Sequence, residues 1–123
     1  MLQLGITGTD KLTVKEKNLA TWFKTGLAPV YATPSMIAFM EETSMYSVMP
    51  YLEEGDITVG ISVNIKHVKA CTVGSEVVCH TKLERIEDNI LTFYVEVTLN
   101  DEKIGYGYHK RAIVERERFL KKL

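Results

Sequence analysis

Residues 31–42, YATPSMIAFMEE, decide the fold because they predict the one long helix of the chain. Thr33 has a side chain that can cap a helix N-terminus, and Pro34 suits the first helical position. Residues 35–49 contain neither glycine nor proline, so nothing in them breaks a helix. We therefore expect a single amphipathic helix that begins at this turn and runs for about four turns.

Two adjacent acids end the quoted stretch, and only one of them can share a side with the apolar residues. At about 100° per residue, Glu41 falls about 140° from Met36. That direction lies between Val48 and Met45, whereas Glu42 points away from the apolar stripe. A buried carboxylate is costly unless it is paired, hydrogen-bonded or protonated. Glu41 therefore either reaches water or a lysine at the rim of the stripe, or it has a function, and the helical wheel alone favours neither.

Four segments after the helix predict β-strands. Apolar residues alternate with polar ones in 56–68 and 90–100, while 75–88 and 104–115 are rich in β-branched and aromatic residues. The short turns EDN and NDEK join the last three segments, so consecutive strands pair antiparallel. Gly105, inside the last segment, predicts a bulge or the close approach of another element.

The N-terminal part gives a weaker pattern. We expect one more strand somewhere between Leu12 and Phe23, although KEKNLATWF (15–23) also fits a helix. The tail from Glu115 fits a short polar helix or a frayed end.

These elements predict an α+β fold in one domain, residues 1–123. A sheet with one apolar face needs a cover, and the long helix is the only candidate. A central α-helix wrapped by a curved antiparallel β-sheet is the hotdog fold. Such a fold leaves little room for an enclosed pocket in one subunit, so we expect a dimer with its sites at the seam.

Composition excludes several classes of function. With 46% hydrophobic residues and a net charge of −1, the chain gives no electrostatic case for binding nucleic acid or an anionic membrane. No apolar run approaches the roughly 20 residues that span a bilayer. Asp10 and Lys11 interrupt the N-terminus where a signal peptide needs an apolar stretch. The spacing of Cys71 and Cys79 indicates neither zinc nor a disulfide, and we expect a cytoplasmic protein.

A few polar residues are candidates for chemistry. His67 ends a long alternating strand, a place where a lone histidine is more often structural. His80 and His109 lie within strands, and no spacing suggests a metal site. Thr33 stands at the positive end of the helix, where free backbone N–H groups can hold an oxyanion or a thioester carbonyl.

Three segments carry a resemblance to a known family. They are PVYATPSMIAFMEE (29–42), TVGISVNIKHVKACTVG (58–74) and IGYGYHKRAIVERERF (104–119). With these spacings the chain resembles the fluoroacetyl-CoA-thioesterase-like branch of the hotdog superfamily, from about Thr13 to Phe119.

The resemblance implies a set of catalytic residues. The threonine, glutamate and histidine of the family fall on Thr33, Glu41 and His67, and the glycine near the substrate carbonyl falls on Gly60. Glu41 would then act as a general base toward water, or attack the thioester itself to give an anhydride. Thr33 would orient the carboxylate or the carbonyl, and His67, from the partner subunit, would assist proton transfer.

The resemblance also suggests how the substrate is bound. In the fluoroacetyl-specific enzyme, aromatic residues ahead of the catalytic threonine gate the pocket. The corresponding positions here are Lys24 and Leu27, while Tyr31 keeps an aromatic ring nearer the threonine. The missing gate argues against fluoroacetyl selectivity and leaves another short or medium acyl group. Lys66, Lys69, Lys110 and Arg111 are candidates for a basic rim that binds the phosphates of coenzyme A.

We therefore expect a homodimer, with further pairing to a tetramer left open, that hydrolyses an acyl-CoA thioester. It needs no cofactor, since coenzyme A is part of the substrate, and no nucleic acid, membrane or metal. The alternative is a non-catalytic hotdog protein that binds acyl-CoA or a similar small apolar ligand. A hydratase or dehydratase acting on acyl thioesters is a weaker third option.

Overall fold

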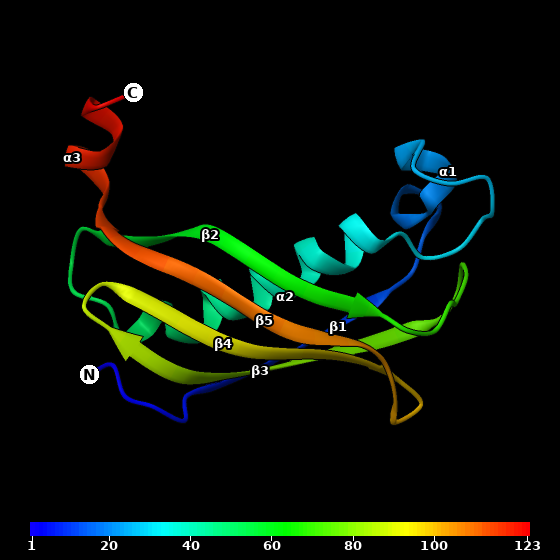
Figure 1. Cartoon of the computed structure of the whole chain (residues 1–123), viewed down its shortest axis with the longest axis horizontal. Coiled ribbons are helices and arrows are strands. Elements are labelled where there is room, and N and C mark those ends of the chain that lie inside the picture. Colours follow the sequence, from blue (N-terminus) through cyan, green and yellow to red (C-terminus); the bar gives the residue numbers. More distant parts are fainter.

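The computed structural model describes all 123 residues and contains five strands and three α-helices. Figure 1 shows one curved sheet with α2 lying across one of its faces. The strands are β1 (Thr7–Thr13), β2 (Asp56–His67), β3 (Glu76–Glu87), β4 (Ile90–Leu99) and β5 (Glu102–Glu115). The helices are α1 (Ala20–Phe23), α2 (Thr33–Val48) and α3 (Arg116–Lys121), with short 3-10 turns at Glu16–Asn18 and Met49–Tyr51.

The sheet is antiparallel throughout, with the strand order β1-β3-β4-β5-β2. Asp88, Asn100 and Asp101 adopt positive φ angles in the two predicted turns, a conformation that Asn and Asp tolerate better than most residues. The predicted hotdog fold, a curved sheet around a central helix, is confirmed. No helix has the length and apolar composition needed to cross a bilayer.

Packing of α2 against the sheet builds the core. Met36, Met40 and Val48 are fully buried, together with residues of β3, β4 and β5. A Cβ atom at Gly105 would overlap the sulfur of Met36, so glycine is what lets the helix lie this close to β5. The predicted close approach at Gly105 is confirmed.

The buried face of α2 is centred differently from the predicted stripe. It includes Phe39, Thr43 and Ser44, whereas Met45 is only half-buried. Thr43 and Ser44 can be buried because each hydroxyl donates to the backbone carbonyl one turn earlier. Glu41 consequently lies at the rim of the buried face and is half-buried, while Glu42 is exposed.

The first strand is earlier than predicted. Residues 7–13 pair with β3, and residues 15–23 instead form a 3-10 turn and α1, which was the alternative interpretation. In β1 only Gly8 and Leu12 are even half-buried, so this edge strand shows no alternation of apolar residues. The C-terminal tail forms α3, as one of the two interpretations predicted, and the Glu115 carboxylate accepts from the N–H groups of its first turn.

The other edge of the sheet, β2, is open. Residues 60–64 are exposed in the single chain, and they include Ile61 and Val63. Figure 1 shows α1 and α3 at opposite ends of the sheet, both projecting beyond the β2 edge. A long, apolar and unprotected edge strand is a template for pairing with another chain.

Candidate active site

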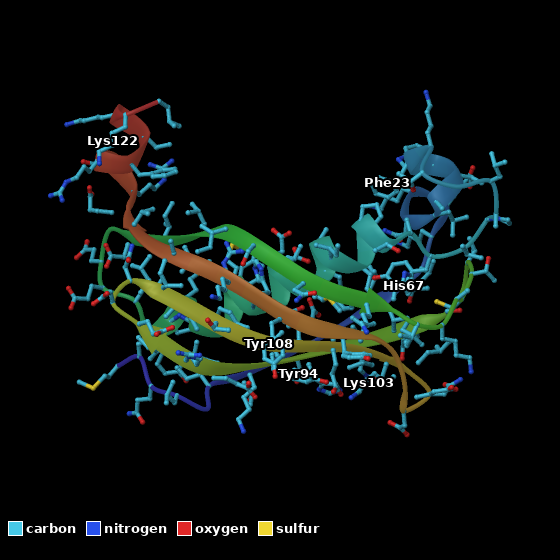
Figure 2. The ribbon with its side chains drawn as sticks, in the orientation of Figure 1. Phe23, His67, Tyr94, Lys103, Tyr108 and Lys122 are labelled. Carbon is cyan, nitrogen blue, oxygen red and sulfur yellow. The ribbon has the colours of Figure 1, made fainter.

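Thr33 and His67 meet at one end of the molecule. Thr33 is the first residue of α2, His67 is the last residue of β2, and Oγ1 of Thr33 lies 2.8 Å from Nδ1 of His67 in a hydrogen bond. Ala32, rather than Thr33, occupies the N-cap position, and the Thr33 side chain does not cap the helix. The predicted cap is therefore wrong, and the hydroxyl is committed to the histidine instead. Figure 2 shows His67 at the end of β2 nearest α1.

A cavity of about 360 Å³ opens beside this pair. Its walls are mostly small and apolar, and Tyr31, Thr33, His67 and Lys69 supply the larger polar groups. The Tyr31 ring stands edge-on to His67, with ring centroids 6.1 Å apart. The Nε2 atom of His67 is buried and has no hydrogen-bond partner in the chain. The pair thus places a half-buried imidazole beside this cavity.

Burial lowers the pKa of His67 below its ordinary value of 6.5. A neutral imidazole is therefore favoured at neutral pH. In that form His67 can accept a proton or take part in a relay with the Thr33 hydroxyl.

Glu41 lies in a different place, against β2 and β5. A second cavity of about 250 Å³ is lined by Glu41, Gly60, His109 and the exposed part of β2. A Cβ atom at Gly60 would lie 3.3 Å from Oε1 of Glu41, 3.5 Å from Cε1 of His109 and 3.6 Å from Nη1 of Arg111. The carboxylate, the imidazole and the guanidinium therefore border one carbon-sized space that glycine leaves open.

The three proposed catalytic residues do not converge within one chain. Glu41 follows Thr33 by eight residues on the same helix, which corresponds to about 12 Å of helix rise. Thr33 and His67 are neighbours in the same chain, so the expectation that His67 alone comes from a partner does not hold. If the three residues work together, Glu41 has to come from a second chain.

The remaining predicted binding residues are differently placed. Tyr31 lines the cavity and is buried, whereas Leu27 is fully exposed outside it. Lys66 is exposed and precedes His67 on β2, so by strand alternation it points to the opposite face of the sheet. Arg111 is only 6% exposed and lies between α2 and β2, so the structure contradicts its expected position on an exposed rim.

Several functional candidates were missed by the sequence analysis. His109 is buried beside Glu41, but a strand position gave no sign of this. Lys69, by contrast, was a candidate for the basic rim, and it lines the larger cavity, where its amine pairs with Glu102 at 2.6 Å. Trp22 and Phe23 expose aromatic surface on α1, next to the positions where the gate was expected. The sequence TWFK (21–24) contains these two adjacent aromatic residues, and this pattern could have indicated them.

The two buried histidines predict how stability depends on pH. Burial lowers the pKa of both His67 and His109 below 6.5. As pH falls below about 6.5 the unfolded chain takes up protons that the folded chain resists, so the free energy of unfolding decreases. We expect a lower urea midpoint at about pH 5.5 than at about pH 7.5, and a smaller difference between the two in His109→Gln. Equal differences in both proteins would contradict the assignment for His109.

Comparisons with known proteins identify the family of the chain. The family model of the fluoroacetyl-CoA-specific thioesterase FlK matches residues 14–117. The chain is 31% identical over 94 residues to the fluoroacetyl-CoA thioesterase of Streptantibioticus cattleyicolor, an overlap of 76% of this chain and 68% of that protein. The match includes the segments that contain Thr33, Glu41, Gly60 and His67.

Solved structures give the same result. A crystal structure of the fluoroacetyl-CoA thioesterase superimposes with a TM-score of 0.91 at 25% identity, covering 99% of this chain and 95% of that chain. A variant of the fluoroacetyl-CoA-specific thioesterase in complex with fluoroacetate and CoA gives 0.87 at 27% identity, covering 96% and 99%. A thioesterase superfamily member from Thermus thermophilus gives 0.91 at 24% identity, covering 98% and 89%, and supports the fold alone. This chain therefore belongs to the fluoroacetyl-CoA-specific thioesterase family of hotdog proteins.

Proposed function

We propose that the protein is an acyl-CoA thioesterase that hydrolyses a short or medium acyl thioester, at two sites formed between the protomers of a homodimer. The observation that carries this proposal is the hydrogen bond between Thr33 and His67 at the mouth of a small apolar cavity. A helix cap or a surface histidine would explain neither the bond nor the burial of the imidazole. Membership of a family of thioesterases supports the reaction class.

The homodimer supplies the missing carboxylate. Antiparallel pairing of β2 with β2 of a second copy would cover the open edge and its apolar residues. A register that brings His67 opposite the partner's Gly60 places the two-fold axis near Val63. It also brings the partner's Glu41 toward Thr33 and His67, because Glu41 borders Gly60. Each dimer then has two equivalent sites, and α1 and α3 flank the partner.

Two chemical routes fit this arrangement. Glu41 can remove a proton from water, which attacks the thioester carbon, or it can attack that carbon itself and form an anhydride that water then opens. In both routes the C–S bond breaks, one water is consumed, and a carboxylic acid and the thiol of coenzyme A are released. The N–H groups of Thr33 and Ser35 in the first turn of α2 can hold the carbonyl oxygen, while the Thr33 hydroxyl stays bonded to His67.

The size of the cavity limits the acyl group. About 360 Å³ between small apolar side chains suits a short or medium chain. Leu27 is fully exposed and the cavity wall nearest α1 is formed by Ala20, Thr25 and Val30, so no aromatic side chain of α1 closes the cavity. We infer that fluoroacetyl-CoA is not preferred over other acyl thioesters of similar size. The proposed chemistry needs no cofactor beyond the coenzyme A of the substrate.

We also propose where the enzyme is located in the cell. Both cysteines, Cys71 and Cys79, are free, which fits a reducing compartment. We therefore place the enzyme in the cytoplasm.

Thiol release from a panel of acyl-CoA thioesters tests the function. We expect turnover of acyl groups of about two to eight carbons, with a decline for longer chains that exceed the cavity. After correction for the difference in intrinsic reactivity between the two thioesters, fluoroacetyl-CoA should be hydrolysed no more than about tenfold faster than acetyl-CoA. Tight binding of these thioesters without any release of thiol would replace the proposal with the non-catalytic alternative.

A further inference from the structure

A buried histidine and a buried arginine of β5 lie directly behind Glu41. His109 is 1% exposed and Arg111 is 6% exposed. Their side chains face α2, and the Phe93 ring of β4 stacks on His109 with a centroid distance of 6.3 Å. Neither residue is needed to complete the proposed trio, so their burial requires a separate explanation.

The hydrogen bonds of His109 fix its protonation. Nδ1 lies 2.9 Å from the carbonyl oxygen of Ser62, and only a protonated Nδ1 can donate there. Nε2 lies 3.2 Å from Nη1 of Arg111, which is always a donor, so Nε2 has to accept. Both bonds form only in the neutral imidazole with its proton on Nδ1. Burial, which lowers the pKa of His109, acts in the same direction.

The hydrogen bonds of Arg111 fix its orientation. Nε donates to Oγ1 of Thr58 at 2.8 Å, and Nη2 donates to the carbonyl oxygen of the same residue at 3.0 Å. Nη1 donates one hydrogen to His109, and it also borders the space at Gly60. Of the five donors of a guanidinium, three are thereby held, and one of the remaining two belongs to Nη1, which borders the Gly60 space together with the Glu41 carboxylate.

Charge balance connects this arginine to Glu41. The three ion pairs of the chain involve other residues, so no carboxylate is within 4.0 Å of Arg111. A buried guanidinium without a counter-charge is strongly unfavourable. Burial lowers the pKa of Arg111, and Glu41 is the one acid that opposes this effect. From β2 and β4 only uncharged residues face the cluster, namely Thr58, Gly60, Ser62 and Phe93.

We propose that His109 and Arg111 form a positioning pair for Glu41: the guanidinium supplies the buried positive charge opposite the carboxylate, and the neutral imidazole fixes the guanidinium. The pair holds the carboxylate in place at the Gly60 space, where a base or nucleophile is required. This inference rests on the proposed function, because it assigns its role through Glu41.

Kinetics of substituted proteins test the pair. In Arg111→Met we expect kcat to fall about 10²-fold while KM changes less than about threefold. Arg111→Lys keeps the charge and should recover part of the rate. Arg85→Met, the same substitution at an exposed arginine of β3, should behave as wild type.

The histidine is tested by a conservative and a non-conservative change. His109→Gln retains one donor and one acceptor and should keep most of kcat, whereas His109→Phe loses both and should resemble Arg111→Met. In the unsubstituted protein, ¹⁵N spectra of the imidazole should show a protonated Nδ1 and a bare Nε2 at neutral pH. That measurement needs no variant to fold, and a charged imidazole or the opposite tautomer would overturn the proposal.

The outcomes separate this inference from the proposed function. If Glu41→Gln is inactive and Arg111→Met keeps kcat within about threefold, the pair has no positioning role and the thioesterase remains. A rise in KM alone in Arg111→Met would make Arg111 a substrate-binding residue and would also overturn the pair. If the wild-type protein releases no thiol, or Glu41→Gln is as active as wild type, the failure lies in the proposed function itself.

Discussion

Replacing Glu41 with glutamine should lower kcat for acyl-CoA hydrolysis by about 10³-fold. It should also lower the melting temperature, because it leaves the buried Arg111 guanidinium without its counter-charge. The amide has nearly the shape of the carboxylate, so the rim of α2 can keep its packing. It has no charge, however, and can neither remove a proton from water nor attack a thioester. The measurement is steady-state thiol release with the best substrate of the acyl-CoA panel, together with thermal unfolding of both proteins.

Glu42 provides the matched control. It is the neighbouring residue on the same helix, carries the same side chain and is exposed. Glu42→Gln removes the same charge about one residue of helix away, so we expect a kcat within about twofold of wild type. Equal losses in the two variants would indicate a general effect of charge on α2. No loss in either would remove Glu41 from the mechanism and favour the binding protein.

The parts of the fold that the sequence predicts well are those in which the pattern and the packing coincide. Residues 35–49 lack helix breakers, and the alternation in 90–100 matches β4, whose apolar face is buried in the core. The alternation in 56–68 also predicts a strand, but Ile61 and Val63 of its apolar set are exposed and Thr58 is buried. The strand β1 was placed too late because an edge strand with little buried surface does not need apolar alternation. Local pattern therefore locates elements that build the core and misses those that only border it.

Candidate site residues were recognised by resemblance rather than by geometry. The wheel placed Glu41 near the apolar side but could not tell a rim position from a buried one, because the true buried face includes Thr43 and Ser44. Thr33 looked like a helix cap, since threonine is a preferred N-cap residue and proline is common at the first helical position. Its bond to His67 joins residues 34 positions apart, and no local pattern contains such a contact.

Arg111 shows a further limit of sequence reasoning. An arginine in a strand is usually solvated, and a rim that binds phosphate was the reasonable expectation. Its burial depends on three acceptors, two from Thr58 and one from His109, that the chain assembles from β2 and β5. Only the register of these two strands, with Gly60 opposite Arg111, brings the set together.

The central claim is that each site takes Thr33 and His67 from one protomer and Glu41 from the other. Hybrid dimers test it directly, because the same two substitutions can be distributed in two ways. One hybrid pairs a Glu41→Gln chain with a His67→Ala chain. The other pairs a wild-type chain with a chain that carries both substitutions. Two different affinity tags allow each hybrid to be isolated from the parent homodimers.

The two hybrids have opposite expected activities. In the first, the unchanged His67 and the unchanged Glu41 lie on different protomers and form one intact site, so we expect about half of the wild-type kcat per dimer. In the second, each site contains one substituted residue, so activity should be near background although one chain is fully wild type. The reverse result, an active second hybrid and an inactive first, would show that the trio works within a single chain and would contradict the shared site.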